Sequence, residues 1–497
     1  MVDVEADVVI VGYGAAGVCA AIEAASAGVS VVVLDRFAGG GATAMSGGVV
    51  YAGGGTRQQV AAGVTDSTDA MFRYLLTEVG SAVSKETLRR FCDDSAKMLA
   101  WLEDQGVPFE ASLCPYKTSY PSNKYYLYHS GSEIVRSEVA PPAARGHRAK
   151  GTGTSGKVFF ARLAESARRH GVRVLTQTDA RELIMSDDRV AGVRCRVLRG
   201  WPRAVHRVLS RYAAKPGLYV PKIGRKLHAM AAALERRFGR PLEVRARRGV
   251  VISAGGFVNN REMMRLYAPG YRGGLPLGTP GDDGRGIELG ASVGGRVARM
   301  DNVSAWRFIT PPSALQKGIL VGANGRGVCD ARLYGAAIGD AIVRDHGGRA
   351  WLLVDDDIVR EARAQIPVET LWFQRLTALN RLGRGRVRGA TLDEVAARAG
   401  VDAAGLRDTA GSFGKPPYSL IDVSFRSRKA GPTPILTLGG LVVDEDTGQV
   451  VGVPGLYAAG RSAVGVCSES YVSGLSLADC VFSGRRAGQH VAKESGC

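Results

Sequence analysis

Long apolar runs and paired cysteines are missing from this sequence. No run of eighteen apolar residues occurs, so a transmembrane helix is not expected. The eight cysteines are scattered without a C-x-x-C pair, which argues against a metal cluster or a disulfide framework and fits a reducing cytoplasm. The N-terminus lacks a signal-peptide pattern, because Val8 already begins an apolar strand. With 497 residues, the chain is long enough for two or three domains with a large core.

Positive charge is concentrated in one segment. The formal net charge is +18, and residues 194–248 hold sixteen Lys or Arg against two acids, which accounts for +14. Val205, Val208 and Tyr212 have helical spacing there, in a pattern interrupted by Pro216 and Pro221. Other apolar residues of the segment are Trp201, Leu209, Leu218, Tyr219, Val220, Ile223, Leu227, Met230 and Phe238.

Two interpretations fit such a basic amphipathic segment. An anionic membrane surface attracts it through charge and apolar contact, and a solvated surface excursion is the alternative. No nucleic-acid-binding motif accompanies the charge, so a specific nucleic-acid partner is not expected. The sequence therefore predicts a cytoplasmic protein that attaches peripherally to the inner face of the cell membrane through residues 194–248.

The stretch from position 7 to Asp35 has the pattern of a dinucleotide-binding βαβ unit. An apolar run meets Gly12, Gly14 and Gly17 in G-x-G-x-x-G spacing, and a helical segment follows. Gly12 permits the tight turn, Gly14 lets the backbone approach a pyrophosphate, and Gly17 allows close helix–strand packing. The pyrophosphate binds at the positive end of the helix. Asp35 stands where the acid that binds the ribose is expected.

Further glycine turns return along the chain. The loop 39–48 offers backbone amides and small hydroxyls. A buried strand at 250–253 enters another glycine turn, and Gly455–Gly460 repeats the pattern of a short strand that enters a glycine turn. The predicted fold is α/β: a Rossmann-like dinucleotide-binding domain from 1–275, with the basic insertion 194–248, and from 428–497. Residues 276–427 differ in character and are predicted to form an inserted α+β cap domain.

These motifs resemble those of the fumarate reductase and 3-ketosteroid dehydrogenase flavoproteins over nearly the whole chain except the basic insertion. The resemblance rests on the N-terminal fingerprint, SGG at 46–48, SAGGF at 253–257, TLDEVAARAGVDAAGL at 391–406 and GLYAAG at 455–460. It implies FAD, held noncovalently because the loop 39–48 contains no His. The cofactor-binding residues expected are Gly12, Gly14, Ala15, Ala16, Gly17, Asp35, Arg36, Gly40, Gly41, Ala42, Thr43, Ser46, Gly47, Gly48, Ala180, Ala254, Gly255, Gly460, Arg461, Ser476 and Leu477.

Departures within the resemblance indicate the substrate. Dicarboxylate reductases have a His where this chain has Leu438, which cannot bind an anion. Tyr471 resembles the motif tyrosine of ketosteroid dehydrogenases, and the Val-Ser-Gly that follows it is closer to the Δ4-(5α) branch than to the Δ1 branch. Residues 330–334 resemble the cap segment that supplies a second active-site tyrosine, here Tyr334. The resemblance therefore implies a 3-oxosteroid substrate.

Desaturation beside a ketone needs a base for the alpha proton and a hydride acceptor, which is the flavin N5. We expect Tyr471 to act as the base, Ser473 and Tyr334 as relay or carbonyl partners, and a backbone N–H near Gly474 to stabilise the enolate. Exchange of the two tyrosine roles stays open. So do Δ1-dehydrogenation and reduction of an enone or enoate, and the sequence does not identify the external electron acceptor.

Overall fold

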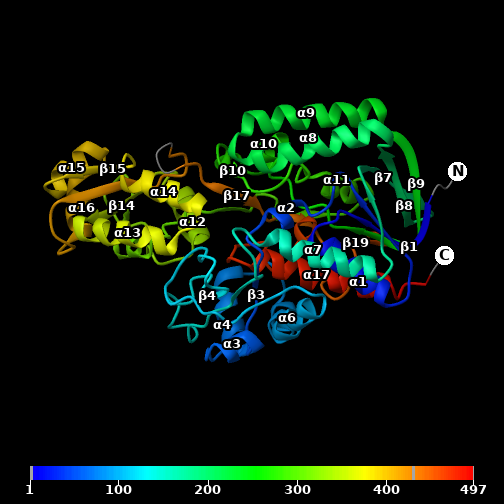
Figure 1. The fold of residues 1–497 in the computed structure, drawn as a ribbon, viewed down its shortest axis with the longest axis horizontal. Helices are drawn as coiled ribbons and strands as arrows, with labels where there is room; N and C mark the ends of the chain where they lie inside the picture. The colour runs from blue at the N-terminus through cyan, green and yellow to red at the C-terminus, as the bar shows by residue number, and fades with distance from the viewer. Residues whose placement is uncertain (1–3, 428–430, 496–497) are drawn as a thin grey trace.

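The computed structural model describes residues 4–427 and 431–495, with the side chains of 215–219 and 221 left aside. Figure 1 shows a larger lobe, which contains both termini, and a smaller lobe formed by the middle of the chain. The predicted α/β class, with a Rossmann-like domain and an inserted second domain, is confirmed.

A seven-stranded sheet forms the centre of the larger lobe. Its order is β6-β2-β1-β9-β8-β7, and β19 pairs with the end of β9. These strands are β1 (Val4–Val11), β2 (Val31–Asp35), β6 (Arg173–Thr176), β7 (Thr178–Ser186), β8 (Arg189–Val197), β9 (Arg240–Ile252) and β19 (Leu456–Ala458). β6, β2, β1, β9 and β19 run parallel, whereas β7 and β8 form an antiparallel hairpin. Ligands bind at the carboxyl edge of such a sheet, where β1 and β9 enter glycine turns.

The last helix brings the C-terminal segment onto the N-terminal fingerprint. α17 (Leu475–Val491) packs along α1 (Ala15–Ser26), and α7 (Gly156–Arg169) lies beside them on the same side of the sheet (Figure 1). A Cβ at Gly484 or Gly488 would lie 2.4 Å from the carbonyl oxygen of Ala16 or Ala20. These glycines therefore permit the backbone contact that fixes the residues just before α17.

A helical subdomain completes the larger lobe. Its helices are α2 (Gly41–Met45), α3 (Arg57–Ala61), α4 (Thr68–Val79), α5 (Lys85–Asp93) and α6 (Ser95–Asp104), beside a sheet of β3 (Val49–Tyr51), β5 (Gly146–Arg148) and β4 (Leu127–Tyr128). The stretch 85–104 has the pattern of one helix, but the structure has two, because the chain turns at Asp94 between α5 and α6.

The smaller lobe is a four-stranded antiparallel sheet with helices. Its strands are β13 (Ile319–Val321), β14 (Trp351–Asp355), β16 (Tyr418–Asp422) and β15 (Arg386–Gly389). Its helices are α12 (Gly335–Asp345), α13 (Asp356–Glu369), α14 (Trp372–Leu382), α15 (Leu392–Ala399) and α16 (Ala403–Ala410). α11 (Arg285–Ala291), inside the expected range 276–427, instead packs on β7 and β9. We therefore propose that the cap begins near Val303.

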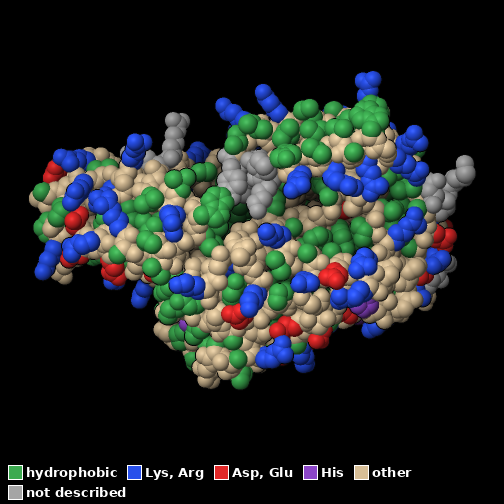
Figure 2. All heavy atoms as spheres, in the orientation of Figure 1, with side chains coloured by type: hydrophobic (Ala, Val, Ile, Leu, Met, Phe, Trp, Pro, Cys, Tyr) green, Lys and Arg blue, Asp and Glu red, His purple; other side chains and the backbone are tan. Residues whose placement is uncertain are grey.

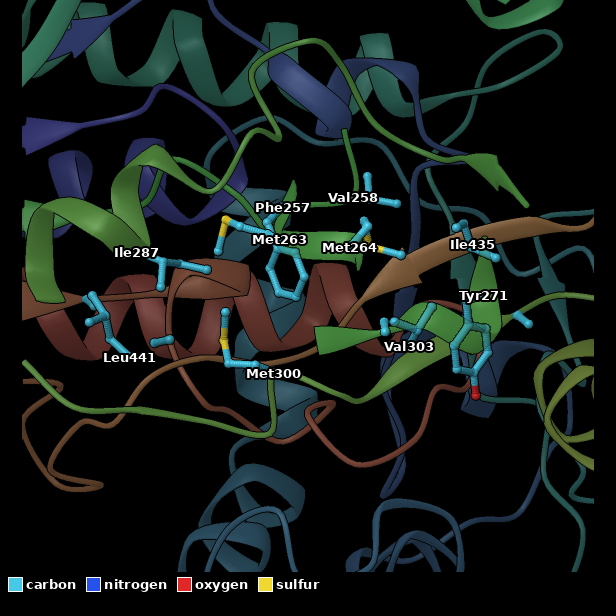
Figure 3. Packing of buried hydrophobic residues seen from close by; sticks show 14 of the residues in the cluster. Phe257, Val258, Met263, Met264, Tyr271, Ile287, Met300, Val303, Ile435 and Leu441 are labelled. Carbon is cyan, nitrogen blue, oxygen red and sulfur yellow. The ribbon is translucent and has the colours of Figure 1, made fainter. Parts of the chain in front are cut away.

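The two lobes share a continuous core. The connecting strands are β10 (Leu275–Pro276), β12 (Val303–Ala305) and β17 (Pro434–Thr437) in one sheet, and β11 (Val297–Ala298) with β18 (Gly440–Leu441) in another. Figure 3 shows Phe257 and Met263 of the larger lobe meeting Met300 and Val303 of the connection, with Met263 on α10 (Arg261–Tyr267). This apolar junction holds the cap against the nucleotide-binding sheet.

The basic insertion is an antiparallel pair of helices, α8 (Gly200–Tyr219) and α9 (Pro221–Phe238), between β8 and β9. Pro216 does not interrupt α8 as its position suggested; the break falls at Val220, and Pro221 begins α9. The predicted apolar residues Leu218 and Tyr219 lie outside the described side chains. Within the described residues, no helix is both long and apolar enough to cross a bilayer.

One buried acid anchors this helical pair to the nucleotide domain. Glu235 of α9 accepts two hydrogen bonds from Arg36, at 2.9 and 2.8 Å, and contacts His206 of α8 at 2.9 Å. Burial raises the pKa of Glu235, but its bonds to His206 and Arg36 outweigh burial and lower the pKa to about 2. The insertion is therefore integrated into the domain and is not a detached surface excursion.

Candidate active site

One large cavity runs between the lobes. Its volume is about 1170 Å³, and its wall combines the carboxyl edge of the sheet, the loops around α2 and the inner side of the cap. All four predicted catalytic residues line it, namely Tyr334, Tyr471, Ser473 and Gly474. Of the predicted cofactor-binding residues, only Gly17 and Gly40 do not contribute to the wall.

Gly17 and Gly40 allow close backbone packing and do not line the cavity. A Cβ on Gly17 would lie 2.0 Å from the carbonyl oxygen of Gly12, so this glycine lets α1 approach β1, as the fingerprint predicts. Gly40 has a φ of +86° and packs its backbone against Ala44 and Phe160. These two glycines shape the turn beside the cavity, and their contact with the cofactor stays a prediction.

Asp35 organises the loop around the cavity. Its carboxylate accepts hydrogen bonds from the backbone N–H groups of Tyr13 at 3.0 Å, Phe37 at 2.8 Å and Gly39 at 3.0 Å. Burial raises the pKa of Asp35 in spite of these donors. A carboxylate has about four lone-pair sites, so capacity for a ribose hydroxyl is left after three backbone bonds.

The cavity wall fits the phosphates of a dinucleotide. Gly14, the N-cap residue of α1, has no side chain to cap the helix, which opens onto the cavity at Gly14 and Ala15. The Ala15 N–H donates to the hydroxyl of Thr43 at 2.9 Å, and Thr43 also lines the cavity. Arg461 donates to Asp282 at 2.7 Å through Nη2, while its buried Nη1 has no partner. An unpartnered guanidinium nitrogen in the wall suits an anionic group, so the residues present fit FAD.

The basic insertion also reaches the cavity, which sequence reasoning missed. Arg207, Ser210 and Arg211 of α8 line it, beside Phe37, whose ring stacks on His206 at 5.8 Å. The helical spacing of these arginines was visible in the sequence, but nothing there showed which side of α8 faces inward. The inner side of the insertion therefore adjoins the end of the cavity near Asp35.

The other end of the cavity is aromatic. Tyr471, in the loop before α17, stacks on Trp306 with ring centroids 4.7 Å apart. Tyr334, at the start of α12 in the cap, lies 6.1 Å from Tyr471 and 5.8 Å from Phe308, centroid to centroid. Leu438 is buried in the same cluster. Two tyrosines predicted from distant motifs thus meet from different lobes in an apolar setting.

Their hydroxyls have different partners. Ser473 contacts the hydroxyl of Tyr128 at 3.3 Å and also acts on Tyr334, whose pKa it lowers against the larger effect of burial. The backbone of Gly474 lowers the pKa of Tyr471 in the same way. Burial dominates and raises the pKa of both Tyr334 and Tyr471 well above the usual value. Tyr128 of β4 is a further member of this hydroxyl cluster.

A dinucleotide cradle joined to an aromatic, hydroxyl-bearing chamber defines a flavoprotein with a separate substrate-binding cap. The chain belongs to the FAD-binding family, because the family model described as "FAD binding domain" matches residues 7–474. The predicted resemblance and the FAD cofactor are confirmed.

Several relatives carry names that describe steroid chemistry. The 3-oxo-5-alpha-steroid 4-dehydrogenase of Comamonas testosteroni is 39% identical, over 91% of this chain and 92% of its own length. The crystal structure of 3-ketosteroid-Δ4-(5α)-dehydrogenase from Rhodococcus jostii RHA1, in complex with 4-androstene-3,17-dione, has a TM-score of 0.81 and 30% identity, covering 99% of this chain and 98% of that one. A flavocytochrome c3 fumarate reductase, with a TM-score of 0.63, 20% identity and coverage of 99% and 79%, shares the fold.

The role of Asp35 gives the first prediction. Asp35→Ala removes the acceptor for three backbone donors and for the ribose, so we expect FAD to bind about 10- to 100-fold more weakly, because a lost bond to a charged group is worth about 1.5–3 kcal/mol. Titration of the FAD-free protein with FAD, followed by flavin fluorescence, measures this. Asp69→Ala, at an exposed position, is the control. Equal affinity of the two variants would remove Asp35 from the cofactor site.

Proposed function

We propose that this protein is an FAD-dependent 3-oxosteroid dehydrogenase of the Δ4-(5α) type. The observation that carries the proposal is the meeting of Tyr334 and Tyr471 around Ser473 in an aromatic chamber. The names of the relatives from Comamonas testosteroni and Rhodococcus jostii support the regiochemistry. Burial of Leu438 in this chamber supports a neutral ketone over a dicarboxylate as the group that binds there.

The bound flavin supplies the acceptor for the hydride that leaves the beta carbon. The aromatic rings of Trp306 and Phe308 provide an apolar wall for the steroid rings. We assign the Tyr471 hydroxyl and the Gly474 N–H to the 3-keto oxygen, because both residues line the cavity, the Gly474 backbone acts on Tyr471, and an O–H and an N–H can each donate to a carbonyl. Such donors stabilise the negative charge that develops on the oxygen as the alpha proton leaves.

We assign removal of the alpha proton to the side of the hydroxyl cluster that contains Tyr334 and Ser473. Since the raised pKa values keep both phenols protonated at neutral pH, the group that accepts the alpha proton must pass its own proton on. Ser473 acts on the pKa of Tyr334, and its hydroxyl contacts that of Tyr128 at 3.3 Å. We therefore propose Tyr334 with Ser473 on the proton side and Tyr471 on the carbonyl side, which is the exchange of roles that the sequence left open.

Anaerobic bleaching of the flavin tests the proposed substrate class. A saturated 5α-3-oxosteroid should bleach the flavin and yield the 4-ene product, identified by chromatography, because the chamber accepts an apolar ketone. Fumarate should not reoxidise the reduced protein at a comparable rate, since Leu438, buried beside Tyr334 and Tyr471, provides no charge at the end of the cavity where the chemistry takes place. A 1-ene product would support the Δ1 alternative, and rapid fumarate turnover would overturn the steroid assignment.

Phenylalanine substitutions test the tyrosine roles. We expect Tyr334→Phe to slow flavin reduction by about 10²–10⁴-fold, the usual range for a general acid or base. Tyr471→Phe removes one oxyanion donor, which typically costs about 10²–10³-fold. Stopped-flow absorbance measures both rates, and steroid binding should persist because the rings are kept. Tyr267→Phe, outside the cavity wall, should react normally. Near-normal reduction by Tyr334→Phe together with a slow Tyr471→Phe would return the base role to Tyr471.

We also propose that the outer face of α8 and α9 attaches to an anionic membrane surface. Trp201, Val205, Val208 and Tyr212 form a stripe on α8 that is 41–62% exposed, and Ile223 and Met230 are exposed on α9. Figure 2 shows hydrophobic side chains gathered over these helices with Lys and Arg around them. Each cation near such a surface contributes about 1 kcal/mol, screened by salt.

Vesicle co-sedimentation tests the attachment. We expect binding to phosphatidylcholine vesicles that contain phosphatidylserine, weak binding to phosphatidylcholine alone, and release at high salt. Val208→Ser with Tyr212→Ser should lower binding about tenfold, because both apolar contacts are lost. Val60→Ser with Met185→Ser removes equally exposed apolar residues elsewhere and should bind normally. Equal sedimentation of the two double variants, or indifference to anionic lipid, would contradict the proposal.

A further inference from the structure

Two buried arginines lie on the cap side of the cavity. Arg307 follows β12, and Arg381 lies in the last turn of α14. Both line the cavity, with 2% and 8% of their surface exposed. Among the described residues, neither has a carboxylate within 4 Å. Buried cations are normally paired, so this arrangement needs an explanation.

Arg307 has a structural role that satisfies most of its donors. Its Nη atoms donate to the carbonyl oxygens of Ser424, Phe425 and Gly431 and to the Thr433 hydroxyl. Arg381 is different, because its one hydrogen bond runs from Nη1 to the carbonyl oxygen of Phe308 at 2.8 Å. Its buried Nε has no partner. Arg381 therefore retains donor capacity beside the cavity, and Arg307 adds a second positive charge nearby.

The positive charges of Arg307 and Arg381 are not neutralised by an adjacent carboxylate among the described residues. Burial lowers the pKa of Arg381 to about 10, and burial together with Arg381 lowers that of Arg307 to about 9. Asp422 acts on Arg307 from a distance, but its oxygens accept hydrogen bonds from Ser424 and Ser427. Both guanidinium groups stay charged at neutral pH, so an anion entering this side of the cavity would be stabilised.

The position of Arg381 relative to the tyrosines indicates which part of the substrate it meets. The aromatic wall leads from Tyr471 to Trp306 and then to Phe308, whose carbonyl oxygen holds Arg381. Phe373, Thr377 and Ala378 of α14 continue the wall around Arg381. An elongated molecule held by its 3-keto end at Tyr471 lies along this wall and extends its other end toward α14.

We propose that Arg381, with the field of Arg307, forms a subsite for a carboxylate carried by the D-ring end of the steroid. The preferred substrate is then a 3-oxosteroid acid with a short side chain, rather than a neutral diketone. This inference rests on the proposed steroid dehydrogenation and specifies its substrate. A guanidinium–carboxylate bond is charge-assisted and stronger than a bond to a neutral carbonyl.

Paired substrates that differ only at the carboxylate test the subsite. The holoenzyme is assayed with 3-oxo-5α-androstane-17β-carboxylate and with its methyl ester, which keeps the ring skeleton and the acceptor oxygens but removes the charge. We expect the acid to have a KM at least tenfold lower than the ester, with kcat within about threefold, because contacts remote from the reacting carbons contribute uniform binding. A KM for the ester equal to or below that of the acid would overturn the subsite.

Variants separate the contribution of Arg381 from general charge. Arg381→Gln should raise the KM of the acid about tenfold or more and leave that of the ester within threefold, and Arg381→Met provides a second variant if the first folds poorly. Arg375→Gln, an exposed position on the same helix, should leave both substrates unchanged. Equal effects of Arg381→Gln on acid and ester would contradict the proposal. Failure of both substrates to bleach the wild-type flavin would instead count against the proposed dehydrogenation.

Discussion

The backbone contact between α1 and α17 is the constraint on which the active site depends. Gly484 and Gly488 let the last helix approach Ala16 and Ala20 more closely than any side chain would permit. α17 begins at Leu475, directly after Gly474, whose φ of +93° and contact with the backbone at Tyr51 also require glycine. One packing contact therefore places the loop containing Tyr471 and Ser473 next to the dinucleotide fingerprint, although these segments lie at opposite ends of the sequence.

The cap contributes the aromatic residues that surround Tyr471 in the active site. Tyr334, Trp306 and Phe308 come from the cap side, and they pack around Tyr471 in an apolar cluster. The same burial raises the pKa of the tyrosines, which makes a stored phenolate unfavourable and a relayed proton transfer necessary. Apolar packing thus provides the steroid surface and also determines how the proton moves.

The sequence predicted the parts of the site that depend on local patterns. The fingerprint, the glycine loop and the motif around Tyr471 each carry their geometry in a few adjacent residues, and most of these residues line the cavity. Contacts between distant segments were not readable. The basic composition of 194–248 suggested a separate surface element, yet Glu235 is buried against Arg36 across 199 residues of sequence. Arg381 was missed for the same reason, since a single arginine on a helix does not show whether it faces solvent or a cavity.

The central claim is that the chain removes a proton from C4 and a hydride from C5 of a 3-oxosteroid. Stopped-flow reduction of the flavin by substrates deuterated at C5 or at C1 tests it most directly. The account predicts slower reduction with deuterium at C5, because that hydrogen is transferred as hydride, and an unchanged rate with deuterium at C1. A primary isotope effect from C1, with none from C5, would contradict it.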